Sequence, residues 1–250
     1  MHVKKDQPKP RDLFTAENLK KFEQPWENKV SVAFFRGTAT GGGVTADTNQ
    51  RLKLATLSHA WNSDPENPRN GMLDAKITRW NWRDKKIAGA PMTFIKPNEF
   101  SFKVNESNFV PIYEQSKYKY LLYVEGHCAA CRYAFMMCLG SVILKVESQC
   151  VADQMWYFPL LKPYVDHVPV KSDLSDLADA IEWCRNNDDK CQEIARNARA
   201  LHDRYISRDG ILDYMQVQSY TTTVFSADFS VYFDGNITAL GSHARLGETV

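Results

Sequence analysis

Short runs of apolar, β-branched and aromatic residues alternate with amphipathic stretches along this chain. Such runs predict buried strands, at residues 30–35, 117–124, 141–146 and 167–170. Stretches with apolar residues every three or four positions predict helices, at residues 15–22, 48–61, 128–139, 153–161, 173–186, 188–205 and 210–220. Strands that alternate with helices over short connections predict an α/β fold, a Rossmann-like parallel sheet with crossover helices.

Some local features refine this map of elements. Thr15 is expected to cap the first helix, and Asp173 or Ser175 the helix at residues 173–186, because short polar side chains accept hydrogen bonds from a helix start. The stretch at residues 72–95 is rich in Trp, Lys and Arg and shows no clear period, so no element is assigned to it.

Two loops at strand ends combine small residues with a nearby arginine. The first, at residues 36–43, contains three consecutive glycines, and Arg51 follows on the first turn of the next helix. The second, at residues 125–127, leads to Arg132, also on a first turn. Ligands of parallel sheets bind at the carboxyl ends of strands, and helix starts attract anions. The loops therefore predict an anion site, with ordinary surface charge as the alternative for both arginines.

Composition narrows the class of protein. Thirty-one Lys and Arg against 30 Asp and Glu leave a formal charge of +1, which disfavours a nucleic-acid binder or a polybasic membrane module. A hydrophobic content of 44% supports a packed core in one large or two small domains. The sequence shows neither a transmembrane run nor the apolar core of a signal peptide.

Several catalytic and metal-binding motifs are absent. The chain has no D-x-D, H-E-x-x-H, G-x-S-x-G, G-x-G-x-x-G or P-loop pattern, so no metal or cofactor is expected. Cys128 and Cys131 form a lone C-x-x-C. A zinc site needs more ligands than this pair supplies. Buried free thiols are the favoured interpretation of the six cysteines, and a redox or zinc module is the alternative.

Three long segments resemble one enzyme family. They are FFRGTATGGG followed by NQRLKLA, KYKYLLYVEGHCAACRYAFMMCLGSVILKVES, and YFPLLKPYVDHVPVKSDLSDLADAIEWCRNNDD. Together they are similar to glycosyltransferase family 90, that of the capsule-associated proteins and protein O-glucosyltransferases, over roughly residues 10–216. The resemblance implies a GT-B fold with two lobes, a UDP-sugar donor, and transfer with inversion to a hydroxyl group.

The resemblance also implies which residues bind the donor. The family's Arg-Gly-Ser/Thr motif matches residues 36–38, and a later arginine that contacts the donor in the family matches Arg51. The segment around the diphosphate matches residues 127–132, and Glu147 is a candidate for contact with a donor hydroxyl. The full predicted set is Arg36, Gly37, Thr38, Arg51, Gly126, His127, Cys128, Ala129, Ala130, Cys131, Arg132 and Glu147. The three arginines of this set would stabilise the UDP leaving group without a metal.

The resemblance leaves the catalytic residue unassigned. The family's general base is an aspartate in the N-terminal lobe, and Asp6 and Asp12 do not stand in a matching context. His127 and the two cysteines of the CAAC segment also differ from the protein O-glucosyltransferases. We therefore predict an arm at residues 1–29 that is a remnant of, or link to, a missing N-terminal lobe. A donor-binding lobe at 30–220 and an irregular tail at 221–250 follow.

The leading hypothesis is thus a family 90 glycosyltransferase that uses UDP-glucose or UDP-xylose and a protein or glycan acceptor. The alternative is a truncated, non-catalytic copy that retains nucleotide-sugar binding or only the fold. The family suggests the lumen of the secretory pathway, whereas the absence of a visible signal peptide leaves the cytoplasm open.

Overall fold

The computed structural model describes residues 16–83, 93–128, 130–149, 154–213 and 215–216. The chain divides into two units, Met1–Ile206 and Ser207–Val250. The named strands and helices lie in the first unit, and the described part of the second is helical at residues 208–213. The division into an arm, a lobe and a tail stays a prediction, since residues 1–15 and 217–250 lie outside the described ranges.

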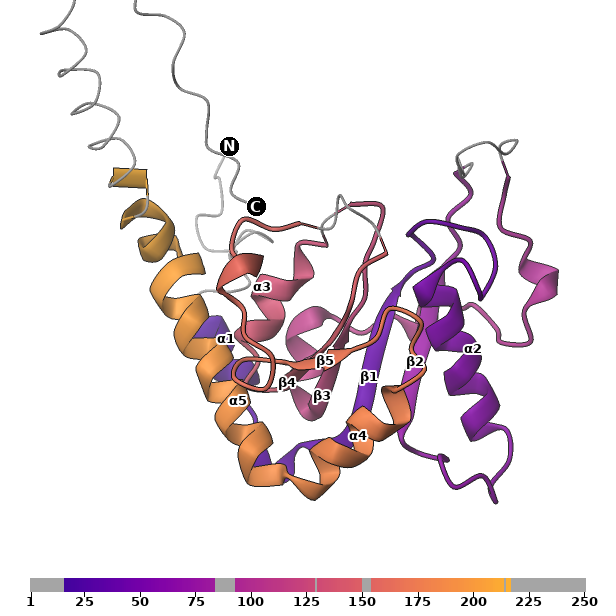
Figure 1. Ribbon diagram of the computed structural model, residues 1–250, viewed down its shortest axis with the longest axis horizontal. Coiled ribbons are helices and arrows are strands. Elements are labelled where there is room, and N and C mark those ends of the chain that lie inside the picture. The colour runs from indigo at the N-terminus through magenta and orange to yellow at the C-terminus, as the bar shows by residue number, and fades with distance from the viewer. Residues whose placement is uncertain (1–15, 84–92, 129, 150–153, 214, 217–250) are drawn as a thin grey trace, which may run out of the picture. The chain divides into compact units, whose positions relative to one another are not determined.

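A five-stranded parallel sheet forms the centre of the first unit (Figure 1). Its order is β2-β1-β3-β4-β5, with every neighbouring pair parallel. The strands are β1 (Val30–Thr38), β2 (Leu73–Arg79), β3 (Tyr118–Tyr123), β4 (Val142–Val146) and β5 (Val168–Val170). The predicted α/β fold with a parallel sheet is confirmed.

Apolar side chains on both sheet faces hold the helices in place. Phe35 and Tyr120 belong to a core shared with α2 (Gln50–Asn62) and α4 (Leu177–Asn186). Phe34 and Leu121, one position away on the same strands, belong to a second core with α3 (Arg132–Met137). Because successive strand residues point to opposite faces, strands that are buried on both sides read as continuous apolar runs.

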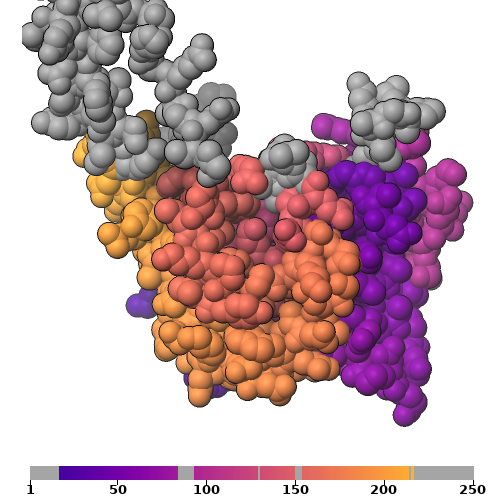
Figure 2. All heavy atoms as spheres, in the orientation of Figure 1, coloured from indigo at the N-terminus to yellow at the C-terminus, as the bar shows by residue number. Residues whose placement is uncertain are grey.

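The remaining helices complete the first unit. They are α1 (Ala16–Phe22) and α5 (Asp188–Leu201), and a π-helical turn, His202–Ile206, follows α5. In the space-filling view, violet atoms around α2 and orange atoms of α4 and α5 gather on different sides of the visible face (Figure 2). No helix in the described ranges is long and apolar enough to span a membrane.

Two strands differ from the predictions. The first predicted strand ended at Phe35, yet β1 continues through residues 36–38, which were expected in a loop. The stretch at 72–95 contains β2, which the sequence left unassigned. Its alternation of Leu73, Ala75 and Ile77 with charged or polar residues is the signal of a half-buried strand. The signal was missed because the strand is only seven residues long and lies in a stretch rich in Trp, Lys and Arg.

Three predicted helices begin or end elsewhere. The helix predicted at 128–139 is only α3, Arg132–Met137. The helix at 153–161 is a single 3-10 turn, Phe158–Leu160, whose Pro159 lacks a backbone donor. The helix at 173–186 begins at Leu177, because Leu174 has a left-handed φ of 60° that no α-helix accommodates. Neither predicted cap, Asp173 nor Ser175, therefore caps it.

The other predicted helices match in their main parts. The helix at 15–22 is α1, with its predicted cap at residue 15 outside the described ranges. The helix at 48–61 is α2, which Asn49 caps by accepting from the N–H groups of Arg51 and Leu52 at 3.0 and 3.2 Å. The helix at 188–205 is α5 and the turn that follows it. Of the helix at 210–220, residues 214 and 217–220 lie outside the described part.

Candidate functional site

Arg51 links the carboxyl ends of the neighbouring strands β1 and β3. It lies in the first turn of α2 and its side chain is buried. Its Nε donates to the Glu125 carbonyl at 2.6 Å, Nη1 to the Thr38 carbonyl at 3.1 Å, and Nη2 to the Val124 carbonyl at 3.1 Å. Thr38 ends β1, and the other two residues directly follow β3, so one guanidinium joins both strand ends.

Arg132 reaches the same place from the start of α3. Its Nη1 donates to the Arg36 carbonyl at 2.6 Å. Its guanidinium carbon lies 5.4 Å from the centroid of the Phe35 ring, and that of Arg51 lies 5.7 Å from the same centroid. The fold therefore brings together the two arginines that the sequence placed at a common anion site.

The charge of Arg132 has little compensation in this position. Burial lowers the pKa of its guanidinium from the usual value. Among the residues that the structure describes, no carboxylate forms an ion pair with it. A partly buried cation without an acidic partner is costly, and a bound anion would remove that cost.

Two glycines leave space beside these arginines. A Cβ atom on Gly126 would lie 3.3 Å from Nη2 of Arg51 and 3.6 Å from the Thr40 hydroxyl. A Cβ atom on Gly37 would lie 3.4 Å from Nη2 of Arg132 and only 2.8 Å from the Phe35 ring. The absence of side chains at both positions therefore keeps the guanidinium groups approachable.

Arg36 is placed differently from the other two arginines. Its guanidinium lies over Phe34, 4.2 Å from the ring centroid, and its Nη2 forms an ion pair with the Asp74 carboxylate at 2.7 Å. Its Nη1 also donates to the carbonyls of Asp74 and Phe35, at 2.8 and 2.9 Å. Within this structure, the Arg36 backbone carbonyl contacts Arg132, while its guanidinium is held by the neighbouring strand.

The segment that precedes α3 contains most of the other predicted residues. Gly126 is buried, whereas His127, Cys128 and Cys131 are exposed. Ala130 donates its N–H to the Tyr123 hydroxyl at 3.3 Å, which ties the segment to β3. Ala129 lies outside the described residues. The exposure of both thiols contradicts the expectation of buried cysteines here, while Cys138, Cys184 and Cys191 are buried as expected.

Glu125 and Glu147 mark the ends of β3 and β4. The buried Glu125 carboxylate accepts hydrogen bonds from the Ser148 hydroxyl and, at 2.7 Å, from the Gln149 N–H. Glu147 is exposed, and its carbonyl accepts from Nε2 of Gln50 at 2.7 Å. The role predicted for Glu147 stays a prediction. The sequence analysis did not single out Glu125, whose signal was an acid directly after a strongly apolar run.

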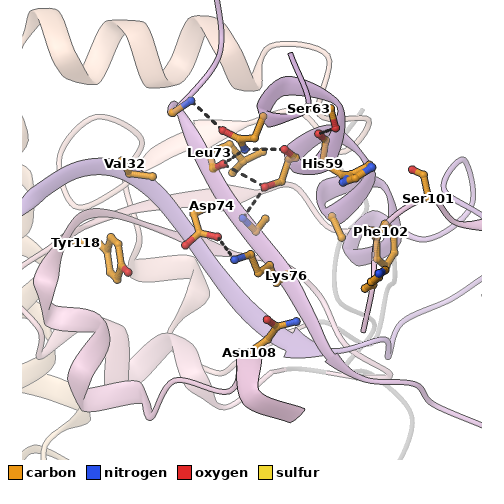
Figure 3. A pocket seen from close by; sticks show the side chains of 16 residues that line it. Val32, His59, Ser63, Leu73, Asp74, Lys76, Ser101, Phe102, Asn108 and Tyr118 are labelled. Atoms are coloured by element: carbon orange, nitrogen blue, oxygen red, sulfur yellow. Dashed lines mark hydrogen bonds and ion pairs between the residues drawn. The ribbon is translucent and has the colours of Figure 1, made fainter. Parts of the chain in front are cut away.

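A cavity of about 680 Å³ lies elsewhere, along β2 (Figure 3). His59, Asp74, Lys76, Phe102 and Tyr118 are among its lining residues. None of the described residues in the predicted set lines it.

The outward edge of β2 at this cavity is already hydrogen-bonded. The Ser58 hydroxyl donates to the Leu73 carbonyl at 3.1 Å and accepts from the Ala75 N–H at 2.9 Å. Asn62 donates to the same Leu73 carbonyl at 2.8 Å. These bonds from α2 occupy two of the backbone groups that an added strand would need.

Side-chain clustering in the part of the chain that the structure describes does not indicate a metal site. In the described ranges, no three His, Cys, Asp or Glu side chains gather in a way that could hold a metal ion. The expectation that the site needs no metal or cofactor remains a prediction.

The fold is thus that of a parallel α/β protein with two arginines brought together at the ends of its strands. The sequence profile of Glycosyl transferase family 90 matches residues 11–224, so the chain belongs to that family. This confirms the resemblance found in the sequence.

Relatives of two kinds match most of the chain. Uncharacterized protein 179R of Invertebrate iridescent virus 6 is 42% identical over 204 residues, 78% of this chain and 17% of that protein. Protein O-glucosyltransferase 1 of Rattus norvegicus is 31% identical over 207 residues, 82% of this chain and 45% of that enzyme. The chain therefore spans less than half the length of either relative.

A solved structure also matches. The crystal structure of Anabaena HepE in complex with UDP-glucose aligns with a TM-score of 0.47 and 10% sequence identity. The alignment covers 86% of this chain and 54% of that one.

Proposed function

We propose that this chain is the donor-binding lobe of a GT-B glycosyltransferase that takes a UDP-sugar, UDP-glucose or UDP-xylose. In this proposal the sugar passes with inversion to a hydroxyl group of a protein or glycan. Family membership and similarity to a protein O-glucosyltransferase support this class of reaction. The observation that carries the proposal is Arg132, a partly buried cation with no acidic partner among the described residues.

The arrangement suits a diphosphate because its cations are held before the ligand arrives. Arg51 is fixed by three carbonyls, and Arg132 by one carbonyl and the Phe35 ring. Negative charge develops on the UDP oxygens as the bond to the sugar breaks. Preorganised donors stabilise such charge without reorganisation, which lowers the barrier of the chemical step. The guanidinium of Arg132 also offers paired N–H groups that match phosphate oxygens.

Arg36 has a different part in this proposal. Its guanidinium is engaged by Asp74, so we assign it to holding the end of β1, where its carbonyl orients Arg132. Gly37 and Gly126 provide the close approach, and the exposed residues His127, Cys128 and Cys131 border the donor. Glu147 remains a candidate for a hydroxyl of the donor sugar.

The test is UDP binding by isothermal titration calorimetry. Arg132→Ala is expected to weaken UDP at least tenfold, and Arg51→Ala also, because each removes a charge-assisted contact worth about 1.5–3 kcal/mol. Arg185→Ala is the matched control, since Arg185 donates to carbonyls of Ser31 and Gly71, at the other end of the strands. Unchanged UDP affinity in both site variants would refute the assignment.

Turnover separates the enzyme from a non-catalytic copy. The purified chain is incubated with UDP-glucose and with UDP-xylose, and released UDP is measured. Release above background that Arg132→Ala abolishes supports a catalytic chain. UDP binding without release supports the alternative of a copy that only binds the nucleotide sugar.

A further inference from the structure

The segment that follows β2 lies beside the proposed diphosphate site. β2 ends at Arg79, at the same carboxyl edge of the sheet as β1 and β3. The amide of Asn81 contacts Nε2 of His127 within hydrogen-bonding distance. A contact between residues 46 positions apart joins the segment after β2 to the segment before α3.

This segment is held on both sides. Trp80 packs against Phe100 and Phe102, with ring centroids 5.7 and 5.9 Å apart. The Oδ1 atom of Asn81 accepts from the Arg83 N–H at 3.1 Å, so its Nδ2 group is the one that faces His127. Backbone on either side of Trp82 is therefore fixed, although the Trp82 side chain itself is 64% exposed.

The sheet topology relates the exposed Trp82 side chain to the position of a bound nucleotide. In doubly wound folds a nucleotide binds in the crevice where the strand order reverses, with its phosphates at a helix start. Here the reversal is between β1 and β3, at Arg51 and Arg132, and β2 is the strand on the other side of β1. The contact between Asn81 and His127 places the segment with Trp82 beside this crevice, so the base of a nucleotide whose diphosphate binds these arginines can extend towards Trp82.

We propose that Trp82 is the stacking platform for the base of the donor nucleotide and so contributes to nucleotide affinity. This inference rests on the proposed function, because it takes the position of the base from that of the diphosphate. An indole presents a large flat face at low conformational cost. Stacking of a base on an aromatic side chain is lost on truncation to alanine, with an effect of about 5- to 150-fold on affinity.

The experiment compares ligands with and without a base. UDP, uridine and inorganic pyrophosphate are titrated into wild-type protein, Trp82→Ala, Trp82→Phe and Arg132→Ala. Trp82→Ala is expected to weaken UDP about tenfold or more and uridine in parallel, with pyrophosphate unchanged. Trp82→Phe should retain most of the UDP affinity, because phenylalanine preserves an aromatic face. Tyr205→Ala, which removes another exposed aromatic side chain, is the control and should bind as wild type.

The outcomes separate this inference from the proposed function. UDP binding that depends on Arg132 but stays within twofold in Trp82→Ala overturns the platform and leaves the diphosphate site intact. Uridine binding that depends on Trp82, with no pyrophosphate binding and no effect of Arg132→Ala, supports the platform and overturns the diphosphate assignment. An unchanged thermal midpoint of Trp82→Ala shows that its effect is not a loss of folding.

Discussion

Lys29 provides a quantitative test of the packing at the amino end of the sheet. It directly precedes β1, and its side chain is buried. Its Nζ donates to the carbonyls of Ser116 and Leu139 at 2.5 and 3.0 Å, and lies 3.2 Å from the Ser141 hydroxyl. Burial lowers the pKa of this amine to about 8 from 10.5. We predict that the free energy of unfolding rises with pH through this range.

The sign follows from proton linkage. Between the folded pKa of about 8 and the unfolded pKa of 10.5, the unfolded chain binds more protons, so raising the pH favours the folded state. Below about pH 8 both states are protonated and the folded state carries the full cost of burying the charge. From about pH 7 to about pH 9.5, these two pKa values correspond to a gain of about 2 kcal/mol.

The assay is urea denaturation at a series of pH values, with Lys29→Met as the reference. Methionine has a similar length but does not titrate. It leaves buried carbonyls unpaired, so the variant is expected to be less stable at all pH values. Tyrosine and cysteine residues titrate above pH 8 in both proteins, and their effect cancels in the difference. If that difference stays constant from about pH 7 to about pH 9.5, the pKa assignment for Lys29 is wrong.

Three further predictions concern the site and the thiols. Gly126→Ala should weaken UDP about tenfold, since its Cβ would lie 3.3 Å from Arg51 Nη2; calorimetry that shows wild-type affinity contradicts this. Asp74→Asn should lower the free energy of unfolding, measured by urea denaturation, by about 1–3 kcal/mol. The effect is smaller than for a fully buried ion pair because Asp74 is 31% exposed. An unchanged urea midpoint argues against a stabilising ion pair between Asp74 and Arg36. Cys128 and Cys131 should react with a thiol reagent in the native protein, while burial, which raises the pKa of Cys138 to about 12, should protect Cys138. Rapid native labelling of Cys138 by mass spectrometry would count against that protection.

Local pattern was sufficient for much of the fold. The runs at 117–124 and 141–146 are strands because continuous apolar, β-branched and aromatic residues suit a parallel sheet that is covered on both faces. The predicted helix at 48–61 is α2, although its cap Asn49, which accepts from the first helical N–H groups, was not predicted. The pattern failed where a single backbone conformation decides the outcome, as at Leu174, whose left-handed φ delays α4.

The sequence by itself determined that this is a parallel α/β chain of family 90 type, with arginines near the ends of its strands. Only the tertiary structure decided how those arginines differ. Arg51 and Arg132 lie 81 positions apart in sequence, yet they flank the same Phe35 ring. Arg36, one residue from Phe35, is instead held by Asp74 on the neighbouring strand. The physical reason is that alternation along a strand sends adjacent side chains to opposite faces, and their partners come from elements that only the sheet brings together.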